Sequence, residues 1–278
     1  MPRELVALAV RTPGFREYAD EPLGPGEIRV RTRYGAPKHG TELHMYRRDS
    51  PFGDSRWDPR ERVFLPGASE QGGFPRPLGN IAVGEVIEVG TGVEGAASSE
   101  GIAVGDVVAG YGPLRETQRW AWGTPGPYPG VRKVPPGMSW QAAVCLDPAT
   151  VALGGVRDGG VRIGDRVAVF GLGAIGLVAL QIAKVAGASF VAAVDPIEGR
   201  RAVAARTGAD LVLDPTAVDA GLEIRRAAAP LSGRPPGVDV AIESSGQARA
   251  LHRRDRRRGS SPWRRRSESA RAAPNECV

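Results

Sequence analysis

Three glycines spaced as G-x-G-x-x-G lie in the middle of the chain. Gly171, Gly173 and Gly176 follow a short apolar stretch and open an amphipathic one. In this setting the first glycine permits a tight turn, the second lets the backbone approach a pyrophosphate, and the third lets a helix press on a sheet. The first amides of such a helix, at Ala174 and Ile175, offer N–H groups and partial positive charge to phosphates. We expect a dinucleotide-binding loop; the alternative is a glycine turn without a ligand.

An acid follows the next apolar stretch, FVAAVD, and favours one dinucleotide. Asp195 is placed to accept hydrogen bonds from the ribose hydroxyls of adenosine and to repel a 2′-phosphate. The sequence therefore favours NAD as the cofactor. Arg200 and Arg201 temper this preference, because a basic residue in this region can accept the phosphate of NADP.

A polar turn ends the last apolar stretch, VDVAIE. Glu243, Ser244, Ser245 and Gly246 would lie at the carboxyl edge of a parallel sheet, where ligands of such sheets bind. Ser244 and Gly246 are candidates for cofactor contact. An ordinary turn from strand to helix is the alternative.

The elements that must hold these residues alternate between strands and helices from residue 161 to 246. Four apolar strands separated by helices predict a parallel sheet. Residues 1–135 contain instead short strands broken by Gly and Pro, among them GEIRVRTRYG, whose polar and apolar residues alternate as in a strand with one wet face. The stretch 47–78 is rich in Pro, Gly and Arg and is expected to be a surface excursion. The fold class is therefore α/β, with a β-rich part followed by a parallel sheet.

Composition and charge narrow the class of protein. No apolar run approaches the roughly 20 residues that cross a bilayer, and no secretory signal is evident, so we expect a cytoplasmic protein. Cys145 and Cys277 cannot make a disulfide framework. The net charge of +6 resides entirely in residues 252–278, which carry nine Arg and three acidic residues. The neutral remainder argues against nucleic-acid binding, although RRDRRRGSSPWRRR leaves it as an alternative.

Several motifs in order resemble the medium-chain dehydrogenase/reductase superfamily, the group of zinc alcohol and sorbitol dehydrogenases. They are GEIRVRTRYG, HGTELHMY, GEVIEVGTGV, VGDVVAGYG, DPATVAL and GDRVAVFGLGAIGLVALQIAKVAGA. The resemblance covers residues 1–251 and implies a GroES-like domain at 1–138 and a linking helix with a partial Rossmann domain at 139–251. The Arg-rich residues 252–278 show neither helical nor strand periodicity, and we expect them to be a disordered tail. It also implies hydride transfer between a nicotinamide cofactor and an alcohol or polyol, or its carbonyl counterpart.

The residues at the zinc positions of that family depart from its pattern. His39 stands where zinc members have a Cys, and Asn80 and Ile81 stand where they have His and Glu. Asp147 matches a further ligand position. Catalytic zinc takes three protein ligands of nitrogen, sulfur or carboxylate type, and only His39 and Asp147 qualify. We therefore expect an enzyme without zinc.

The resemblance also implies a proton relay. Thr41 and His44 match a hydroxyl and an imidazole that carry a proton from the substrate to solvent in the family. His39 would polarise the substrate oxygen in place of the metal; a polar surface loop is the alternative for all three residues. Thr150 matches a position beside the nicotinamide, or is a helix residue that bonds its own backbone.

A complete Rossmann sheet has six strands, whereas four are recognisable here. Arg-Arg-Asp-Arg-Arg-Arg at 253–258, in GC-rich codons, reads Ala-Ala-Ile-Ala-Ala-Val one base later, which suggests a frameshift. We then expect the sheet edge through which family members form homodimers to be missing. A nucleotide-binding remnant without catalysis is the alternative to an active oxidoreductase. The identity of the small-molecule substrate is not readable from these residues.

Overall fold

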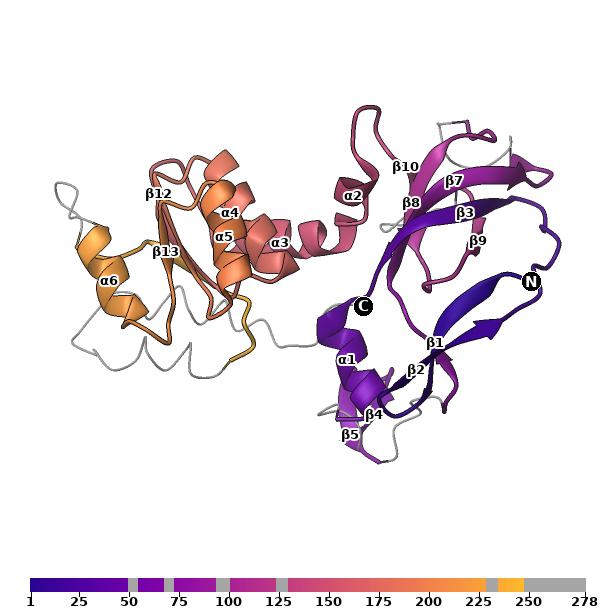
Figure 1. The fold of residues 1–278 in the computed structure, drawn as a ribbon, viewed down its shortest axis with the longest axis horizontal. Helices are drawn as coiled ribbons and strands as arrows, with labels where there is room; N and C mark the ends of the chain where they lie inside the picture. Colours follow the sequence, from indigo (N-terminus) through magenta and orange to yellow (C-terminus); the bar gives the residue numbers. More distant parts are fainter. Residues whose placement is uncertain (50–54, 68–72, 94–100, 124–129, 229–234, 248–278) are drawn as a thin grey trace. The chain divides into compact units, whose positions relative to one another are not determined.

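The computed structural model describes residues 1–49, 55–67, 73–93, 101–123, 130–228 and 235–247, and the expected tail at 252–278 lies outside them. The chain divides into two compact units, Met1–Leu146 and Asp147–Val278. The stretch 139–146, assigned from the sequence to the second domain, clusters with the first unit. Figure 1 shows the helices and strands of both units. Among the described residues, no helix has the length and apolar character needed to cross a bilayer.

The first unit is built mainly from antiparallel strands. In chain order its elements are β1 (Arg3–Ala9), β2 (Thr12–Glu17), β3 (Glu27–Ala36), α1 (His39–Arg47), β4 (Ser55–Asp58), β5 (Val63–Pro66), β6 (Arg76–Pro77), β7 (Ile81–Val89), β8 (Val107–Tyr111), β9 (Thr117–Ala121), β10 (Val131–Lys133) and α2 (Trp140–Ala143). They form a five-stranded sheet in the order β10-β8-β7-β3-β9, a three-stranded sheet in the order β2-β1-β6, and the hairpin β4-β5.

Alternating apolar side chains of β3 and β7 make the core of this unit. Ile28 and Val30 of β3, and Ala82 and Val86 of β7, are fully buried and pack in one cluster. The register pairs Ile28 with Val89 and Val30 with Val86 across the two strands. The strand predicted from GEIRVRTRYG is therefore confirmed, because its apolar positions face the interior.

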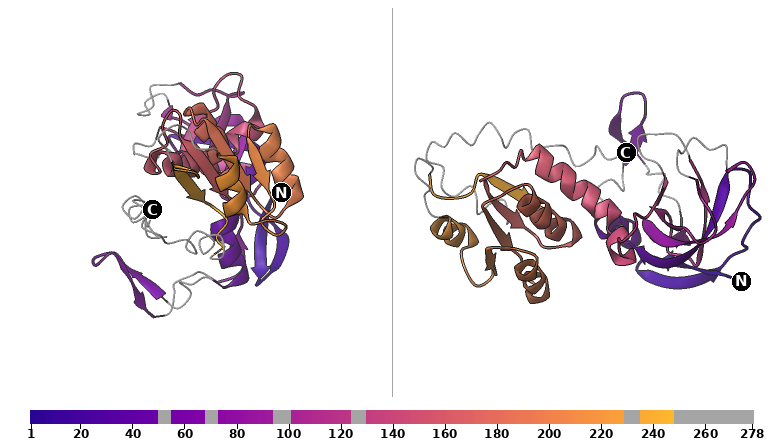
Figure 2. Two further views of the ribbon diagram at one scale, coloured as in Figure 1. Left: turned by 90° about the vertical axis from the view of Figure 1, so that its left-hand side faces the viewer. Right: turned by 90° about the horizontal axis from the view of Figure 1, so that it is seen from above.

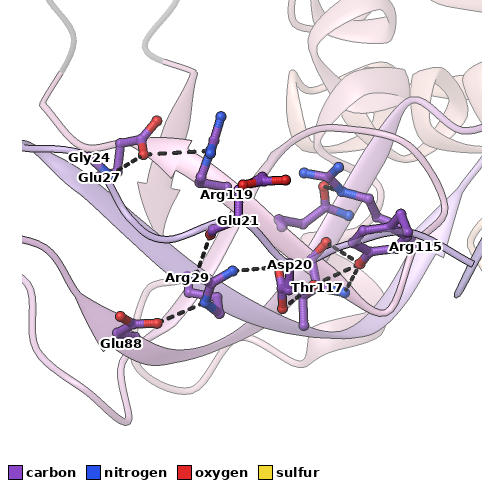
Figure 3. A network of polar contacts seen from close by, with 11 residues as sticks. Asp20, Glu21, Gly24, Glu27, Arg29, Glu88, Arg115, Thr117 and Arg119 are labelled. Carbon is purple, nitrogen blue, oxygen red and sulfur yellow. Dashed lines mark hydrogen bonds and ion pairs between the residues drawn. The ribbon is translucent and has the colours of Figure 1, made fainter. Parts of the chain in front are cut away.

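Arg29 departs from that alternation. It lies at a position expected to be wet, yet it is only 8% exposed. Its guanidinium donates to Glu88 Oε2 on β7 at 2.8 Å and to the carbonyl of Glu21 at 2.7 Å, and it pairs with Asp20 (Figure 3). The hydrogen bond to Glu88 raises the pKa of Arg29 against the opposing effect of burial. The buried charge is thus neutralised, and it fastens the segment between β2 and β3 to the sheet.

The hairpin β4-β5 lies within the stretch that was expected to be a surface excursion. Its register pairs Trp57 with Phe64, whose ring centroids are 5.0 Å apart. Both rings stay exposed to about two fifths of their area. The sequence showed no hairpin here, because a two-stranded ribbon without a buried face has no apolar alternation to reveal it.

The second unit is a parallel sheet with helices on both faces (Figures 1 and 2). In chain order its elements are α3 (Leu146–Asp158), which begins at the last residue of the first unit, β11 (Arg166–Phe170), α4 (Ala174–Val185), β12 (Phe190–Val194), α5 (Glu198–Arg206), β13 (Leu211–Leu213), α6 (Ala220–Ala227) and β14 (Val240–Glu243). The strand order β13-β12-β11-β14 confirms the four parallel strands expected from the sequence.

Each face of this sheet has its own apolar cluster. Leu180 of α4 and Ala204 of α5 pack with Val167 and Val169 of β11 on one face. Ile224 of α6 packs on the other face, in the cluster that is centred on the alanines of β11 and β12. Helices on both faces mean that the chain reverses its direction of winding between β11 and β14. The carboxyl ends of these two strands therefore form a switch point, where ligands of doubly wound sheets bind.

Candidate functional site

The glycine loop joins β11 to α4 at that switch point. Gly171 adopts φ +86°, and a Cβ atom there would lie 2.5 Å from the amide nitrogen of Ser245. A Cβ atom on Gly176 would lie 1.8 Å from the carbonyl oxygen of Gly171. Both glycines are buried. The fold itself therefore requires glycine at these two positions, whether or not a ligand binds.

Gly173 is different, because no contact in the described part of the chain requires glycine there. It is the N-cap of α4, with extended backbone and no side-chain cap, and a Cβ atom built on it meets no atom within 4 Å. Within the described residues, no acceptor binds the amides of Ala174, Ile175 and Gly176. Uncapped N–H groups at an open helix N-terminus are suited to receive an anion.

Asp195 follows β12 and holds the loop in place. Its side chain is 3% exposed, and its Oδ2 accepts from the amide of Leu172 at 2.7 Å while Oδ1 accepts from the amide of Ile197 at 2.8 Å. The carboxylate therefore already has a structural task in the absence of ribose. Each carboxylate oxygen can accept a further bond, so the predicted ribose contact stays a prediction.

Two arginines of α5 surround this acid. Arg200 Nη1 lies 3.5 Å from Asp195 Oδ2, and its side chain is 46% exposed. Arg201 Nη1 donates to the carbonyl of Asp195 at 2.8 Å and pairs with Asp214 at 3.1 Å. The hydrogen bonds from Thr216, with the charge of Arg201, lower the pKa of Asp214. Arg201 is thus held within the protein, whereas Arg200 extends from the surface beside Asp195.

Ser244 directly follows β14 and contacts the glycine loop. Its hydroxyl donates to the carbonyl of Gly171 at 2.7 Å, and its amide donates to the carbonyl of Phe170 at 2.8 Å. The structure therefore brings Ser244 to the glycine loop, as the sequence predicted for this edge. Thr150 lies exposed on α3 of the same unit. Their contact with a cofactor remains a prediction.

The residues of the expected proton relay lie on α1 in the first unit. The backbone of His39 and Thr41 belongs to this helix, but their side chains lie outside the described structure. His44 is half exposed, and its Nδ1 lies 2.8 Å from Asp49 Oδ1. An imidazole that reaches solvent and is oriented by a carboxylate can pass a proton outward. The backbone of this segment is helical, so the alternative of a polar loop is wrong as to its secondary structure.

The structure brings one unpredicted residue into this segment. Glu42 is 9% exposed, and its carboxylate accepts hydrogen bonds from the amides of Lys38 and Gly79. Gly79 precedes Asn80, whose backbone amide donates to the carbonyl of Ala36 at 3.1 Å. Glu42 was part of a quoted motif, but sequence reasoning gave it no role because its partner is 37 residues away.

The positions that match zinc ligands do not make a three-ligand set. Asn80 supplies an amide, and Ile81 is 1% exposed in the core of β7. Asp147 is buried at the start of α3. Among the described residues, no group of three His, Cys, Asp or Glu could hold a metal ion. With an amide at Asn80 and an aliphatic side chain at Ile81, these positions offer fewer than the three ligands that a catalytic zinc takes, so their chemistry does not fit such a site.

Comparison with known proteins places the chain in a family. The family described as zinc-binding dehydrogenase matches residues 174–254. D-guloside 3-dehydrogenase of Escherichia coli (strain K12) is 46% identical over 255 residues, which cover 90% of this chain and 68% of that protein. This chain belongs to the medium-chain dehydrogenase/reductase superfamily. Another member, (R,R)-butanediol dehydrogenase of Bacillus subtilis (strain 168), is 29% identical over 246 residues, with 83% of this chain and 67% of that protein covered.

Solved structures of the superfamily agree with the fold. The 2R,3R-butanediol dehydrogenase of Bacillus subtilis superposes with a TM-score of 0.67 at 24% identity, over 91% of this chain and 73% of that one. The alcohol dehydrogenase TADH of Thermus sp. ATN1 gives 0.62 at 26% identity, over 90% and 72%. The resemblance drawn from the motifs is confirmed, as is the fold class of a GroES-like domain followed by an incomplete Rossmann sheet.

Proposed function

We propose that this chain is an NAD(H)-dependent oxidoreductase that moves a hydride between the nicotinamide and a secondary alcohol of a polyol or glycoside, without catalytic zinc. The observation that carries the proposal is the open N-terminus of α4, where Gly173 leaves room for a pyrophosphate and three amides point to no acceptor in the described chain. The names of two relatives, a guloside dehydrogenase and a butanediol dehydrogenase, support a polyhydroxylated substrate.

The environment of Asp195 supports NAD over NADP. Its buried carboxylate would lie next to the adenosine ribose and repel a 2′-phosphate. The half-exposed guanidinium of Arg200, 3.5 Å away, reduces that repulsion and offers a second anion-binding group. We therefore expect NADH to bind more tightly than NADPH, with a modest ratio between the two affinities.

The chain's own residues would handle the proton. The nicotinamide, when bound, supplies the hydride acceptor. Oxidation of the alcohol also requires its hydroxyl proton to leave, and Thr41 with His44 would pass that proton toward solvent. The pair of His44 and Asp49 orients the imidazole for that task. His39 would stabilise the charge that develops on the substrate oxygen.

A steady-state assay tests the proposal. Reduction of NAD⁺ is followed with a panel of diols, polyols and glycosides, with and without a zinc chelator, and NADH and NADPH affinities are titrated in parallel. We expect turnover that the chelator leaves unchanged and tighter binding of NADH. Loss of turnover on chelation would contradict the zinc-free mechanism. Binding of NADH without any turnover would favour the non-catalytic remnant.

A further inference from the structure

The N-terminus of α1 is tied to a distant turn by one buried carboxylate. Glu42 lies in the first turn of α1 and is more than nine-tenths buried. One of its oxygens, Oε2, accepts from the amide of Lys38, and the other, Oε1, accepts from the amide of Gly79. The amide of Glu42 in turn donates to the carbonyl of Lys38 at 2.8 Å. A single side chain thus joins the start of the helix to the segment between β6 and β7.

The turn at Gly79 has little freedom of its own. Gly79 adopts φ +119°, and a Cβ atom there would lie 2.3 Å from the amide nitrogen of Leu114. The amide of Leu114 donates to the carbonyl of Leu78 at 2.7 Å. The backbone at Gly79 is therefore pressed against the segment that follows β8, and its amide is directed to Glu42.

Asn80 is fixed by the same arrangement. Its backbone amide donates to the carbonyl of Ala36 at 3.1 Å, and its backbone carbonyl accepts from the amide of Gly112 at 3.1 Å. Three segments meet at this residue, and Glu42 adds the link to α1. Charge-assisted bonds from two amides to one carboxylate are stronger than neutral ones, and the carboxylate also lies at the positive end of the helix dipole.

We propose that Glu42 is a positioning residue, which sets the place of Asn80 relative to the first turn of α1. This turn carries His39 and Thr41, so the proposal rests on the function proposed above for its role in turnover. In this arrangement the carboxylate ties the segment that carries Asn80 to the helix that bears the candidate catalytic groups His39 and Thr41. Its removal would leave each segment folded but shift one against the other.

The shift has a measurable cost. A displacement of about 1 Å between catalytic groups can lower turnover by about 100-fold. The nucleotide site lies in the other compact unit and contains none of these residues. Loss of Glu42 should therefore lower kcat while the dissociation constant of NADH stays unchanged.

The test compares the full-length protein with Glu42→Gln, Glu42→Asp and the control Glu17→Gln, an exposed glutamate on β2 of the same unit. Hydrogen exchange is measured at the amides of Lys38 and Gly79, together with kcat, the NADH dissociation constant and the melting temperature. The carboxamide of Gln presents one acceptor oxygen instead of two. The shorter Asp keeps its charge but falls short of Gly79.

We expect faster exchange at Gly79 in both Glu42 variants and at least a tenfold lower kcat, with NADH binding unchanged and the control equal to the wild type. Unchanged exchange at Gly79 would overturn the proposal, and so would a Glu42→Asp protein with full kcat. A wild type that binds NADH but does not turn over would refute the proposed activity alone, since the exchange of Gly79 still decides whether Glu42 holds the two segments together.

Discussion

The three glycines of the loop at 171–176 have different physical reasons to be glycine. Gly171 needs its positive φ and its closeness to Ser245, and Gly176 has no room for a side chain against the carbonyl of Gly171. Gly173 has open space around it. The motif predicted that two of these glycines serve the fold and that the third leaves room for a ligand, and the structure gives the packing reason at Gly171 and Gly176.

Gly176→Ala should unfold more easily. The added methyl group cannot coexist with the carbonyl oxygen 1.8 Å away, so the loop or the helix must move, at a cost of about 2 kcal/mol. Gly155→Ala is the control, since it lies within α3 with no atom within 4 Å of a Cβ and should gain about 0.5–1 kcal/mol. Urea unfolding followed by far-UV circular dichroism measures both. Equal midpoints for Gly176→Ala and the wild type would contradict the packing argument.

At the scale of elements, apolar periodicity predicted β3 in the first unit, and the four strands of the second unit with α4 to α6 between them. It did not reveal α1 or the β4-β5 hairpin, for different reasons. The nine residues of α1 have no apolar stripe, and the helix begins where Glu42 caps it and reaches across to Gly79. The aromatic pair of the hairpin, Trp57 and Phe64, is exposed to solvent. The helix is held by a contact to Gly79, 37 residues away, and the hairpin has no buried face, so neither leaves an apolar pattern in the local sequence.

The turn before β8 gives a pH-dependent contribution to stability. Burial raises the pKa of Asp106, but the hydrogen bonds from Lys133 of β10 and from the amide of Ala103, with the charge of Lys133, outweigh it and lower the pKa. Because the pKa of Asp106 is lower in the folded protein, its ionised carboxylate stabilises the fold at pH values above the pKa of the unfolded chain, which is about 3.9. This stabilisation is lost as the pH falls through the pKa of the folded protein.

Asp106→Asn should therefore lower the urea midpoint at pH 6 and bring it close to that of the wild type at about pH 3. Because the pair is about one-third exposed, the effect at pH 6 should not exceed about 1 kcal/mol. The difference between the two midpoints, measured at several pH values, checks this. A difference that stays constant down to pH 3 would show that the ionised carboxylate is not responsible.

At the scale of the whole molecule, two units with separate cores carry the two halves of the proposed chemistry. The second unit holds the glycine loop, Asp195 and Ser244 at one switch point of its sheet. The first unit holds α1 with His44 and with Glu42, whose carboxylate binds the amide of Gly79. The sequence could assign each group to its part of the chain because glycine spacing and strand–helix alternation are local signals. The chain spans 68% of the length of its guloside dehydrogenase relative.

The proposed activity requires that the open N-terminus of α4 receives the pyrophosphate of a nicotinamide dinucleotide. Isothermal titration of NADH into the wild type, Gly173→Ala and Gly221→Ala tests it directly. Gly221 lies in α6, where a Cβ makes only an ordinary contact. We expect binding to the wild type and to Gly221→Ala, and at least tenfold weaker binding to a normally folded Gly173→Ala. Equal affinities for all three proteins, or no binding of NADH or NADPH to the wild type, would contradict the account.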